Sequence, residues 1–463
     1  MKIAIVGAGI SGLTRAYYLA RDHQVTVFES ESEIGGHTAT KSVEVAGETF
    51  NIDTGFIVYN DWTYPNFIKL MNEIGVMGRA SEMSFSVTCQ NSGLEYAGSN
   101  INTLFADRKN LLRPGYWKML KDIVSFNKAA IEDLQAGNIT ADITLGDYLA
   151  GKGYGRMFRT KYLVPMGAAI WSSTLQAMED FPALFFIRFF KNHGLLSVKN
   201  RPQWYTIEGG SRSYLPALTE SFSDSIRTDV SISKIQRTND YVDVEYKIRS
   251  NSTTEQTSYK ERFDAIVFAT HSDQALALLD DATEAETDIL GAIPYRSNEV
   301  VLHTDASRLP WRERAWSSWN YRLSKDPEAR ESSLPKLTYS MNILQGIESD
   351  TAFCVSLNQT EDIDQSKILG IYNYSHPVFT ADGVEAQARR GEISGSNNTW
   401  FCGAYWANGF HEDGVSSALD VVNSIGALSG SALAGDTQST TTSEIGVASI
   451  GTTRDTTGAP VAS

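Results

Sequence analysis

The sequence predicts an α/β fold in which a Rossmann-like domain, assembled from separated segments, carries an inserted α+β domain. Three observations lead to this fold class. A short apolar run, KIAIV at residues 2–6, is followed at once by GAGISG, which has the spacing GxGxxG. A second strand-like run, QVTVFE at residues 24–29, ends in an acid. A strand, a glycine turn and a helical pattern return in the same order from residue 399.

The first glycine motif has the context of a dinucleotide-binding site, because it lies between a buried strand and a helix. Gly7 allows a tight turn, Gly9 lets the backbone approach a pyrophosphate, and Gly12 lets the helix pack close to the strand. The helix N-terminus offers free N–H groups and a partial positive charge to the phosphates. Glu29 ends the second strand, where its carboxylate can accept hydrogen bonds from the adenosine ribose.

A second glycine turn favours FAD over NAD. Gly35-Gly36-His37-Thr38 follows Glu29 closely, and Asp53-Thr54-Gly55-Phe56 follows a hairpin-like stretch. This arrangement resembles the extended fingerprint of FAD-containing flavoproteins of the glutathione-reductase and amine-oxidase types. The cofactor that we predict is therefore FAD.

Charge and composition exclude several classes of protein. The chain has 463 residues, and 40 Lys and Arg against 55 Asp and Glu give a net charge of −15. An acidic surface repels phosphate backbones, so no nucleic-acid partner is expected. The three cysteines, Cys89, Cys354 and Cys402, form no metal-binding pattern and favour a reducing compartment. We expect a cytoplasmic protein without a bound metal and without a transmembrane segment, and peripheral contact with a membrane stays open.

The pattern along the chain predicts two interleaved domains. Helical stretches dominate from residue 61 to about residue 202, and strands and turns alternate from 276 to 395. The FAD-binding domain is predicted at residues 1–60, 203–275 and 396–428, and the substrate domain at residues 61–202 and 276–395. Residues 429–463 are rich in Ser, Thr, Gly and Ala without any aromatic residue, which predicts a disordered tail.

The last glycine turn, at residues 408–414, precedes a helical pattern from Val415. A helix N-terminus there can direct N–H groups toward a flavin's pyrimidine oxygen. His411 in this turn is interpreted as a proton relay or a polar anchor near the flavin. For Glu412 and Asp413 the structural alternative is capping of the free N–H groups of the helix that follows this turn.

Through these motifs, the chain resembles the flavin-containing amine oxidoreductase superfamily. In particular, it is similar to the FAD-dependent oxidoreductases found as the N-terminal region of plant cyclopropane fatty acid synthases and as free-standing microbial proteins. The resemblance rests on residues 7–12, 35–37, 53–59, 63–66, 84–87, 162–165, 170–172, 201–204, 338–342, 376–377 and 401–414. It implies FAD contacts at Gly7, Gly9, Ile10, Ser11, Gly12, Glu29, Ser30, Gly36, His37, Thr38, Thr54, Gly55, Phe56, Val230, Gly403, Glu412, Gly414 and Val415.

The chain departs from that family at three points. His37 stands where many relatives have an arginine, and Ala404-Tyr405 stand where many have an acid after the late glycine. No residue matches the lysine of amine oxidases clearly, and Lys336 is a candidate by region alone. Amine oxidation therefore does not follow from the superfamily name.

The expected chemistry is hydride transfer at the flavin N5. Only one GxGxxG motif is present, so no separate NADPH domain is expected. Tyr339 and Asn342 are predicted on one strand and on opposite faces of it, so that only one of them would face the substrate. Aromatic side chains are expected to line the substrate site: Trp171, Trp319, Tyr321, Tyr339, Tyr405 and Trp406.

The leading hypothesis is an FAD-dependent oxidoreductase acting on a hydrophobic, fatty-acyl substrate. One alternative is a redox-neutral FAD-dependent double-bond isomerase of unsaturated lipids. Another is a flavin-binding partner subunit of a lipid-modifying methyltransferase. The apolar segment 181–196, which contains Arg188 and Lys191, is interpreted either as a lipid-docking roof or as a core helix with a solvated end.

Overall fold

The computed structural model describes residues 1–197, 199–249, 257–324, 326, 332 and 334–429. The disordered tail predicted from residue 429 falls, beyond that residue, outside the described residues.

The first sheet is parallel and forms the centre of the Rossmann-like domain. Its strands lie in the order β10-β2-β1-β14-β20. Both faces of β1 are buried, which is why its sequence is a continuous apolar run. Because the strands are parallel, their carboxyl ends share one edge, where such sheets bind ligands. The bounds are β1 Lys2–Val6, β2 Gln24–Phe28, β10 Ile226–Arg227, β14 Ala265–Phe268 and β20 Thr399–Phe401.

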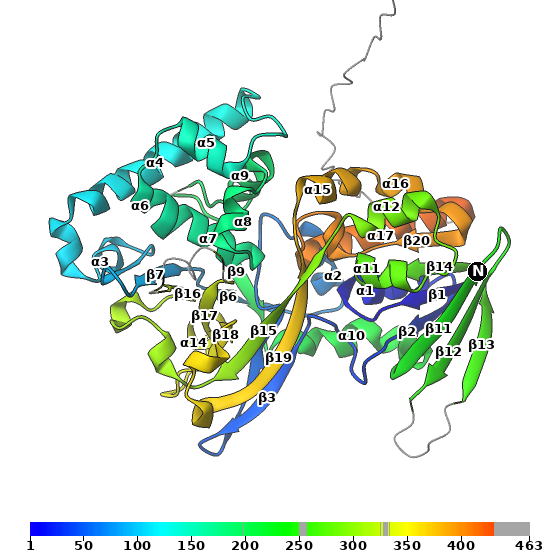
Figure 1. Cartoon of the computed structure of the whole chain (residues 1–463). Helices are drawn as coiled ribbons and strands as arrows, with labels where there is room; N and C mark the ends of the chain where they lie inside the picture. Colours follow the sequence, from blue (N-terminus) through cyan, green and yellow to red (C-terminus); the bar gives the residue numbers. More distant parts are fainter. Residues whose placement is uncertain (198, 250–256, 325, 327–331, 333, 430–463) are drawn as a thin grey trace, which may run out of the picture.

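Helices and a small sheet cover the two faces of this parallel sheet (Figure 1). Ile3 and Ile5 pack in one core with residues of α1, α2, α10 and α17. Ala4 and Val6 pack in a second core with residues of a three-stranded antiparallel sheet and of α11, α12, α15 and α16. The bounds are α1 Ile10–Leu19, α2 Pro65–Glu73, α10 Leu215–Thr219, α11 Ser272–Ala277, α12 Glu284–Gly291, α15 Ala381–Ala388, α16 Arg390–Ile393, α17 His411–Ser429, β11 Val230–Arg237, β12 Val242–Ile248 and β13 Ser258–Phe263.

The second large sheet is mixed and supports the helical part of the molecule (Figure 1). Its strands lie in the order β19-β15-β18-β17-β16-β7-β8, and only the β7–β16 pair is parallel. Its bounds are β7 Phe85–Cys89, β8 Leu94–Ala97, β15 Tyr295–His303, β16 Trp319–Leu323, β17 Lys336–Ser340, β18 Cys354–Leu357 and β19 Ile368–Pro377. The helices on this side are α3 Ile101–Leu104, α4 Pro114–Gln135, α5 Leu145–Gly151, α6 Arg156–Phe158, α7 Val164–Trp171, α8 Leu175–Glu179, α9 Ala183–Asn192 and α14 Met341–Leu344.

The predicted fold class is confirmed: a Rossmann-like domain carries an inserted α+β unit with a mixed sheet. The predicted domain ranges stay a prediction. Within them, α2, α12, α15 and α16 pack on the cores of the parallel sheet although they fall in the stretches predicted for the substrate domain.

Shorter strands connect the two parts. The hairpin of β3 (Thr40–Val45) and β4 (Glu48–Asp53) follows the second glycine turn. A three-stranded sheet pairs β5 (Tyr59–Asn60) and β6 (Gly78–Ser81) with β9 (Trp204–Ile207). Within the described part of the chain, no helix combines the length and apolar character that crossing a bilayer requires.

Candidate dinucleotide site

The loop after β1 has the conformation that its three glycines predicted. Gly7 has φ +102°, and a Cβ atom there would lie 2.8 Å from the carbonyl oxygen of Ala269. A Cβ atom on Gly12 would lie 2.0 Å from the carbonyl oxygen of Gly7. Gly7 and Gly12 are therefore required by the packing of β1, β14 and α1, whether or not a ligand is bound.

Gly9 differs from the other two glycines, because a Cβ atom on it would meet no protein atom within 4 Å. Gly9 is also the N-cap residue of α1, and no side chain caps this helix. The first N–H groups of α1 therefore lack a side-chain acceptor, and an open space adjoins them. Free amides at a helix N-terminus and room for close approach are what a dinucleotide's pyrophosphate needs, so the residues present fit such a group.

Glu29 lies directly after β2 and fixes the first glycine loop. Its Oε2 accepts a hydrogen bond from the N–H of Ala8 at 2.8 Å. Its Oε1 accepts from Ser30 Oγ at 3.1 Å and from the N–H of Glu31 at 3.0 Å. Each carboxylate oxygen has two lone pairs, so the predicted ribose contact remains compatible with these bonds. The N–H of Val230 donates to the carbonyl of Glu29 at 2.9 Å, which places the start of β11 beside this acid.

The second glycine turn packs against the first. The N–H of Gly35 donates to the carbonyl of Ala8 at 2.8 Å, and a Cβ atom on Gly36 would lie 3.3 Å from Gly9 Cα. Gly55 approaches the same turn, since its Cβ atom would lie 2.3 Å from the carbonyl oxygen of His37. Three segments that sequence analysis assigned to one cofactor thus meet at one place.

Thr54 and Phe56 close this junction. The hydroxyl of Thr54 lies 2.8 Å from the hydroxyl of Tyr374 on β19, and the N–H of Phe56 donates to the carbonyl of His37 at 2.7 Å. These two contacts attach the glycine turn to the second large sheet.

Three histidine rings lie together at the second glycine turn, and sequence analysis did not connect them with the site. The ring of His37 lies 5.2 Å from that of His376 and 6.2 Å from that of His271. Its Nε2 is buried without a hydrogen-bond partner. Burial lowers the pKa of His37 to about 3 and that of His376 to about 4, so both rings are neutral near pH 7. Nothing local in the sequence connects these residues, which come from a turn, from the start of α11 and from β19.

The N-termini of α1 and α17 lie side by side. A Cβ atom on Gly414 would lie 2.8 Å from Ser11 Oγ and 3.0 Å from Ile10 Cγ2, so a glycine is needed for this close approach. Val415 is fully buried in the core that these helices share. The N–H of Gly403 donates to Ser417 Oγ at 2.9 Å, which fixes the end of β20 to α17. The late glycine turn is therefore part of the same site as the first.

His411 begins α17 and is enclosed by the second glycine turn. Its Nε2 lies 3.1 Å from Thr38 Oγ1, and its ring stacks on Phe56 with a centroid distance of 3.6 Å. Thr38 Oγ1 lies 2.5 Å from the hydroxyl of Tyr214, so the imidazole belongs to a buried polar chain. Burial, with a smaller contribution from His37, holds the pKa of His411 well below its ordinary value. A role for His411 as a proton relay stays a prediction.

Glu412 accepts hydrogen bonds from the first N–H groups of α2, and not from α17, the helix that the capping alternative concerned. Its Oε2 accepts from the N–H of Phe67 at 2.8 Å, and its Oε1 accepts from the N–H and the Nδ2 of Asn66 at 3.1 and 2.8 Å. Burial raises the pKa of Glu412. The carboxylate of Asp413 accepts from the N–H groups of Phe410 and Asn408 at 2.8 and 3.2 Å and closes its own turn.

Glu412→Ala is expected to lower the free energy of unfolding by about 3 kcal/mol, because several donors at the start of α2 lose a charged acceptor. Urea unfolding of the purified variant measures this loss. Glu385→Ala, an exposed acid on α15, is the matched control and should change stability by less than about 0.5 kcal/mol. Equal stability of the two variants would contradict the capping role.

Tyr339 and Asn342 do not share a strand, and this part of the sequence analysis is wrong. β17 ends at Ser340, and Asn342 lies on the short helix α14. The amide of Asn342 binds the backbone of Phe353 and Thr351 at 2.7 and 2.9 Å, so it holds a loop. Tyr339 is half-buried and meets Trp319 edge to face at 5.0 Å.

The predicted aromatic walls fall into two groups. Trp171, Trp319, Tyr321 and Tyr339 belong to the large core of the inserted unit or to its margin. Tyr405 and Trp406 instead lie in the core behind the parallel sheet, where Tyr405 is 3% exposed. Because Tyr405 and Trp406 are buried in this core, they do not line the expected substrate site.

The apolar segment 181–196 forms α9, a core helix. Phe186, Phe189 and Phe190 are buried, and Arg188 and Lys191 are exposed. The ring of Phe189 stacks on His193 at 3.8 Å and on Phe410 at 5.4 Å, so the helix packs against the turn that leads into α17. The structure thus agrees with the core interpretation of this segment.

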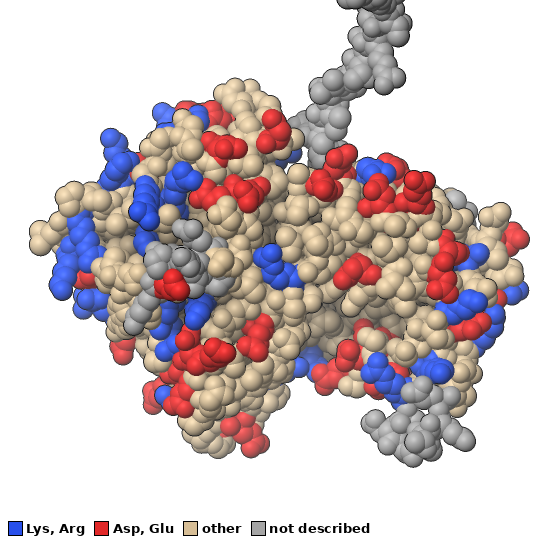
Figure 2. Space-filling model, viewed as in Figure 1, with Lys and Arg blue, Asp and Glu red and all other residues tan. Residues whose placement is uncertain are grey.

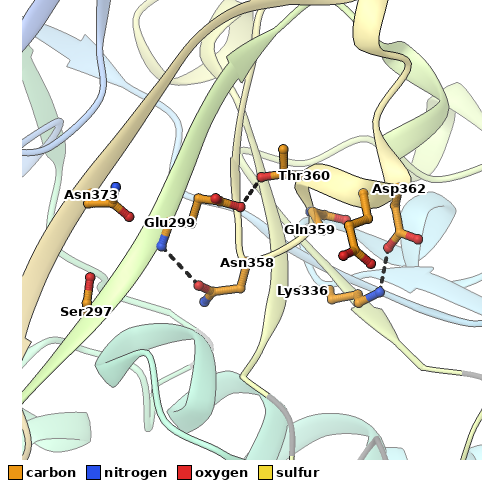
Figure 3. Close-up of a pocket in the computed structure, with 9 residues that line it drawn as sticks. Ser297, Glu299, Lys336, Asn358, Gln359, Thr360, Asp362 and Asn373 are labelled. Atoms are coloured by element: carbon orange, nitrogen blue, oxygen red, sulfur yellow. Dashed lines mark hydrogen bonds and ion pairs between the residues drawn. The ribbon is translucent and has the colours of Figure 1, made fainter.

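A polar cavity of about 430 Å³ is lined by Ser297 and Glu299 of β15 (Figure 3). Lys336 lines it and forms an ion pair with Asp362 at 2.5 Å, at the opposite end of β17 from Tyr339. Its other lining residues include the acids Glu299 and Glu361. An acidic lining repels a diphosphate, so we assign the dinucleotide to the glycine loops and not to this cavity.

Comparisons with known proteins agree with this geometry. A family described as "NAD(P)-binding Rossmann-like domain" matches residues 5–74. A search of curated proteins finds no match. The matched residues contain the end of β1, all of α1 and β2, and both early glycine turns, so a dinucleotide-binding Rossmann-like domain is present.

Solved structures resemble nearly the whole chain. Cyclohexylamine oxidase from Brevibacterium oxydans IH-35A is 14% identical with a TM-score of 0.65, over 93% of this chain and 99% of that one. Wild-type putrescine oxidase bound to putrescine is 14% identical with a TM-score of 0.64, over 92% and 99%. A CLA-producing fatty acid isomerase from P. acnes is 15% identical with a TM-score of 0.62, over 91% and 97%. At such identities the likeness shows the fold alone: this chain has the fold of flavin-containing amine oxidases.

Proposed function

We propose that this protein is an FAD-dependent oxidoreductase that transfers a hydride between the flavin N5 and a hydrophobic, fatty-acyl substrate. The observation that carries the proposal is the open space at Gly9, beside the uncapped N-terminus of α1 and against the second glycine turn. The FAD contacts expected from the resemblance converge on this space from the loops of residues 7–12 and 35–38 and from the start of α17.

The protein's own residues would bind and orient the cofactor. Free N–H groups of α1 would hold the diphosphate, and Glu29 would hold the ribose. When bound, FAD supplies hydride chemistry at N5. The neutral imidazoles of His37, which is half-buried, and His411, which is buried, have no carboxylate partner among the described residues and would provide polar contacts without adding charge.

The substrate class is supported by the aromatic margin of the inserted unit. Trp319, Tyr339 and Phe410 pack against the large apolar core while remaining partly exposed. The indole nitrogens of Trp171 and Trp319 are buried without a partner. A largely apolar wall of this kind suits an acyl chain better than a small charged amine.

A redox-neutral double-bond isomerase is the second candidate. It is favoured by the likeness to a fatty acid isomerase and by the single GxGxxG motif of the sequence. A third proposal is a flavin-binding subunit that acts with a lipid-modifying methyltransferase, which we infer from the family resemblance alone.

Anaerobic mixing of the flavin-loaded protein with unsaturated or methyl-branched lipids separates these proposals. Lasting loss of the oxidised flavin absorbance is expected for an oxidoreductase. Product formation with the absorbance unchanged would indicate the isomerase. Turnover only after a methyltransferase is added would indicate the subunit, and purified protein that takes up no FAD would contradict all three.

A further inference from the structure

The chain exposes large apolar side chains unevenly. Among the described residues, eleven such side chains are exposed, and five of them lie between residues 101 and 124. Leu112 is 86% exposed and Ile101 is 77% exposed. With Val124, Trp117 and Leu111 they occupy α3, the 3₁₀ turn at residues 108–112 and the first half of α4. Large apolar side chains that are exposed together in one part of a surface mark interaction sites.

Lysines and arginines lie among these apolar residues, so this segment is basic although the chain as a whole is acidic. Residues 101–128 contain six Lys and Arg against two Asp and Glu, whereas the whole chain has a net charge of −15. On α4, Trp117, Lys121, Val124 and Lys128 are all exposed and have the spacing i, i+4, i+7, i+11, which places them on one helix face. Figure 2 shows Lys and Arg gathered on the left of the molecule, where Figure 1 places α3 and α4.

Two of these cations are available for a partner. Among the residues that the structure describes, Lys109 and Lys121 make no ion pair within 4 Å, whereas Lys118 and Lys128 pair with Asp122 and Glu132 along α4. We call Ile101, Lys109, Leu111, Leu112, Trp117, Lys121 and Val124 the α3–α4 surface.

The surface is held in shape by local contacts. Trp117 Nε1 donates to the carbonyl of Leu111 at 3.0 Å, and its ring lies 5.3 Å from Phe105. Asn100 caps α3 through a reciprocal pair of bonds with Thr103. The apolar side chains therefore project from a fixed backbone, and docking does not require this segment to fold first.

We propose that the α3–α4 surface docks the protein on an anionic lipid surface, with its apolar side chains inserted at the headgroup level and its lysines against the lipid phosphates. Exposed leucine, isoleucine and tryptophan beside unpaired lysines are the chemistry of interfacial lipid binding. The charge contrast selects an anionic surface and orients the acidic remainder of the protein away from it. The inference rests on exposure and charge, and it does not depend on the proposed FAD chemistry.

Co-sedimentation of the full-length protein with vesicles tests the proposal. Vesicles of phosphatidylcholine alone are compared with vesicles that also contain phosphatidylglycerol. We expect binding to the anionic vesicles that weakens as salt rises, since exposed charges are screened. Ile101→Ser with Leu112→Ser should weaken binding about tenfold. Lys109→Gln with Lys121→Gln should weaken it about fivefold for each lysine.

Matched controls distinguish this surface from general effects. Met77→Ser, at a site that is 70% exposed, and Lys69→Gln, on the exposed side of α2, should bind like wild type. Unchanged melting temperatures show that each variant is folded. Wild-type protein that binds neither kind of vesicle would overturn the proposal. Variants of the α3–α4 surface that bind as well as wild type would also overturn it. So would a concentration-dependent dimer that Ile101→Ser with Leu112→Ser dissolves without any vesicle binding.

Discussion

Replacing Gly9 by valine is expected to abolish flavin binding while the protein stays folded. The backbone of Gly9 has φ −77°, which every residue type adopts, and its Cβ atom would meet no protein atom within 4 Å. A valine side chain would instead occupy the space assigned to the pyrophosphate. We expect FAD affinity to fall by at least about a hundredfold, because the close approach to the N–H groups of α1 is lost.

Two other glycines serve as comparisons in this experiment. Gly12→Val should lower the melting temperature sharply, since its Cβ atom would lie 2.0 Å from the carbonyl oxygen of Gly7. Gly151→Val, at an exposed helix end with open space around the Cβ atom, should retain flavin. Flavin absorbance per protein and thermal melts give both readouts. Gly9→Val protein that keeps stoichiometric FAD would remove the basis of the proposed function.

Acidification from about pH 7 to about pH 5 is expected to destabilise the protein. The pKa of every one of the seven histidines is lowered, chiefly by burial. The unfolded chain therefore binds more protons than the folded one between pH 6.5 and the lowered values. Stability falls as pH drops through this window. His37 and His376, lowered to about 3 and about 4, each account for about 2 kcal/mol at pH 5.

Three acids act in the opposite direction. Burial raises the pKa of Asp53 to about 6, that of Asp413 to about 7 and that of Glu412 above its ordinary value. These carboxyls bind protons more tightly in the folded state, so their contribution grows as pH falls and offsets part of the loss. The histidines outnumber them, and a net loss of several kcal/mol remains. Urea midpoints at about pH 7 and about pH 5 measure it.

A double variant tests the origin of the acid lability. His37→Gln with His376→Gln should flatten the dependence of the urea midpoint on pH, because two groups that remain neutral in the fold are removed. His23→Gln, near the N-terminus, should leave most of the dependence in place. A wild-type midpoint that does not fall on acidification would contradict the expectation.

The sequence predicted those parts of the site that are local along the chain. Gly7, Gly9 and Gly12 follow a buried strand directly, so strand, turn and helix could be assigned from six consecutive positions and their neighbours. His271 and His376 could not be predicted, because they reach His37 only after β14 and β19 have been placed. The prediction that Asn342 shares a strand with Tyr339 is wrong, because Met341 and Leu344, three positions apart, are both buried on the short helix α14.

The close approach of α17 to α1 has a consequence for synthesis in the cell. Gly414 fits against Ile10 and Ser11, so the site near the start of the chain is completed by residues made about four hundred positions later. During synthesis on the ribosome, β1 and α1 are made long before α17, which packs against α1. We therefore expect capture of the prosthetic group to follow release of the finished polypeptide, and chains that terminate before residue 411 to accumulate colourless.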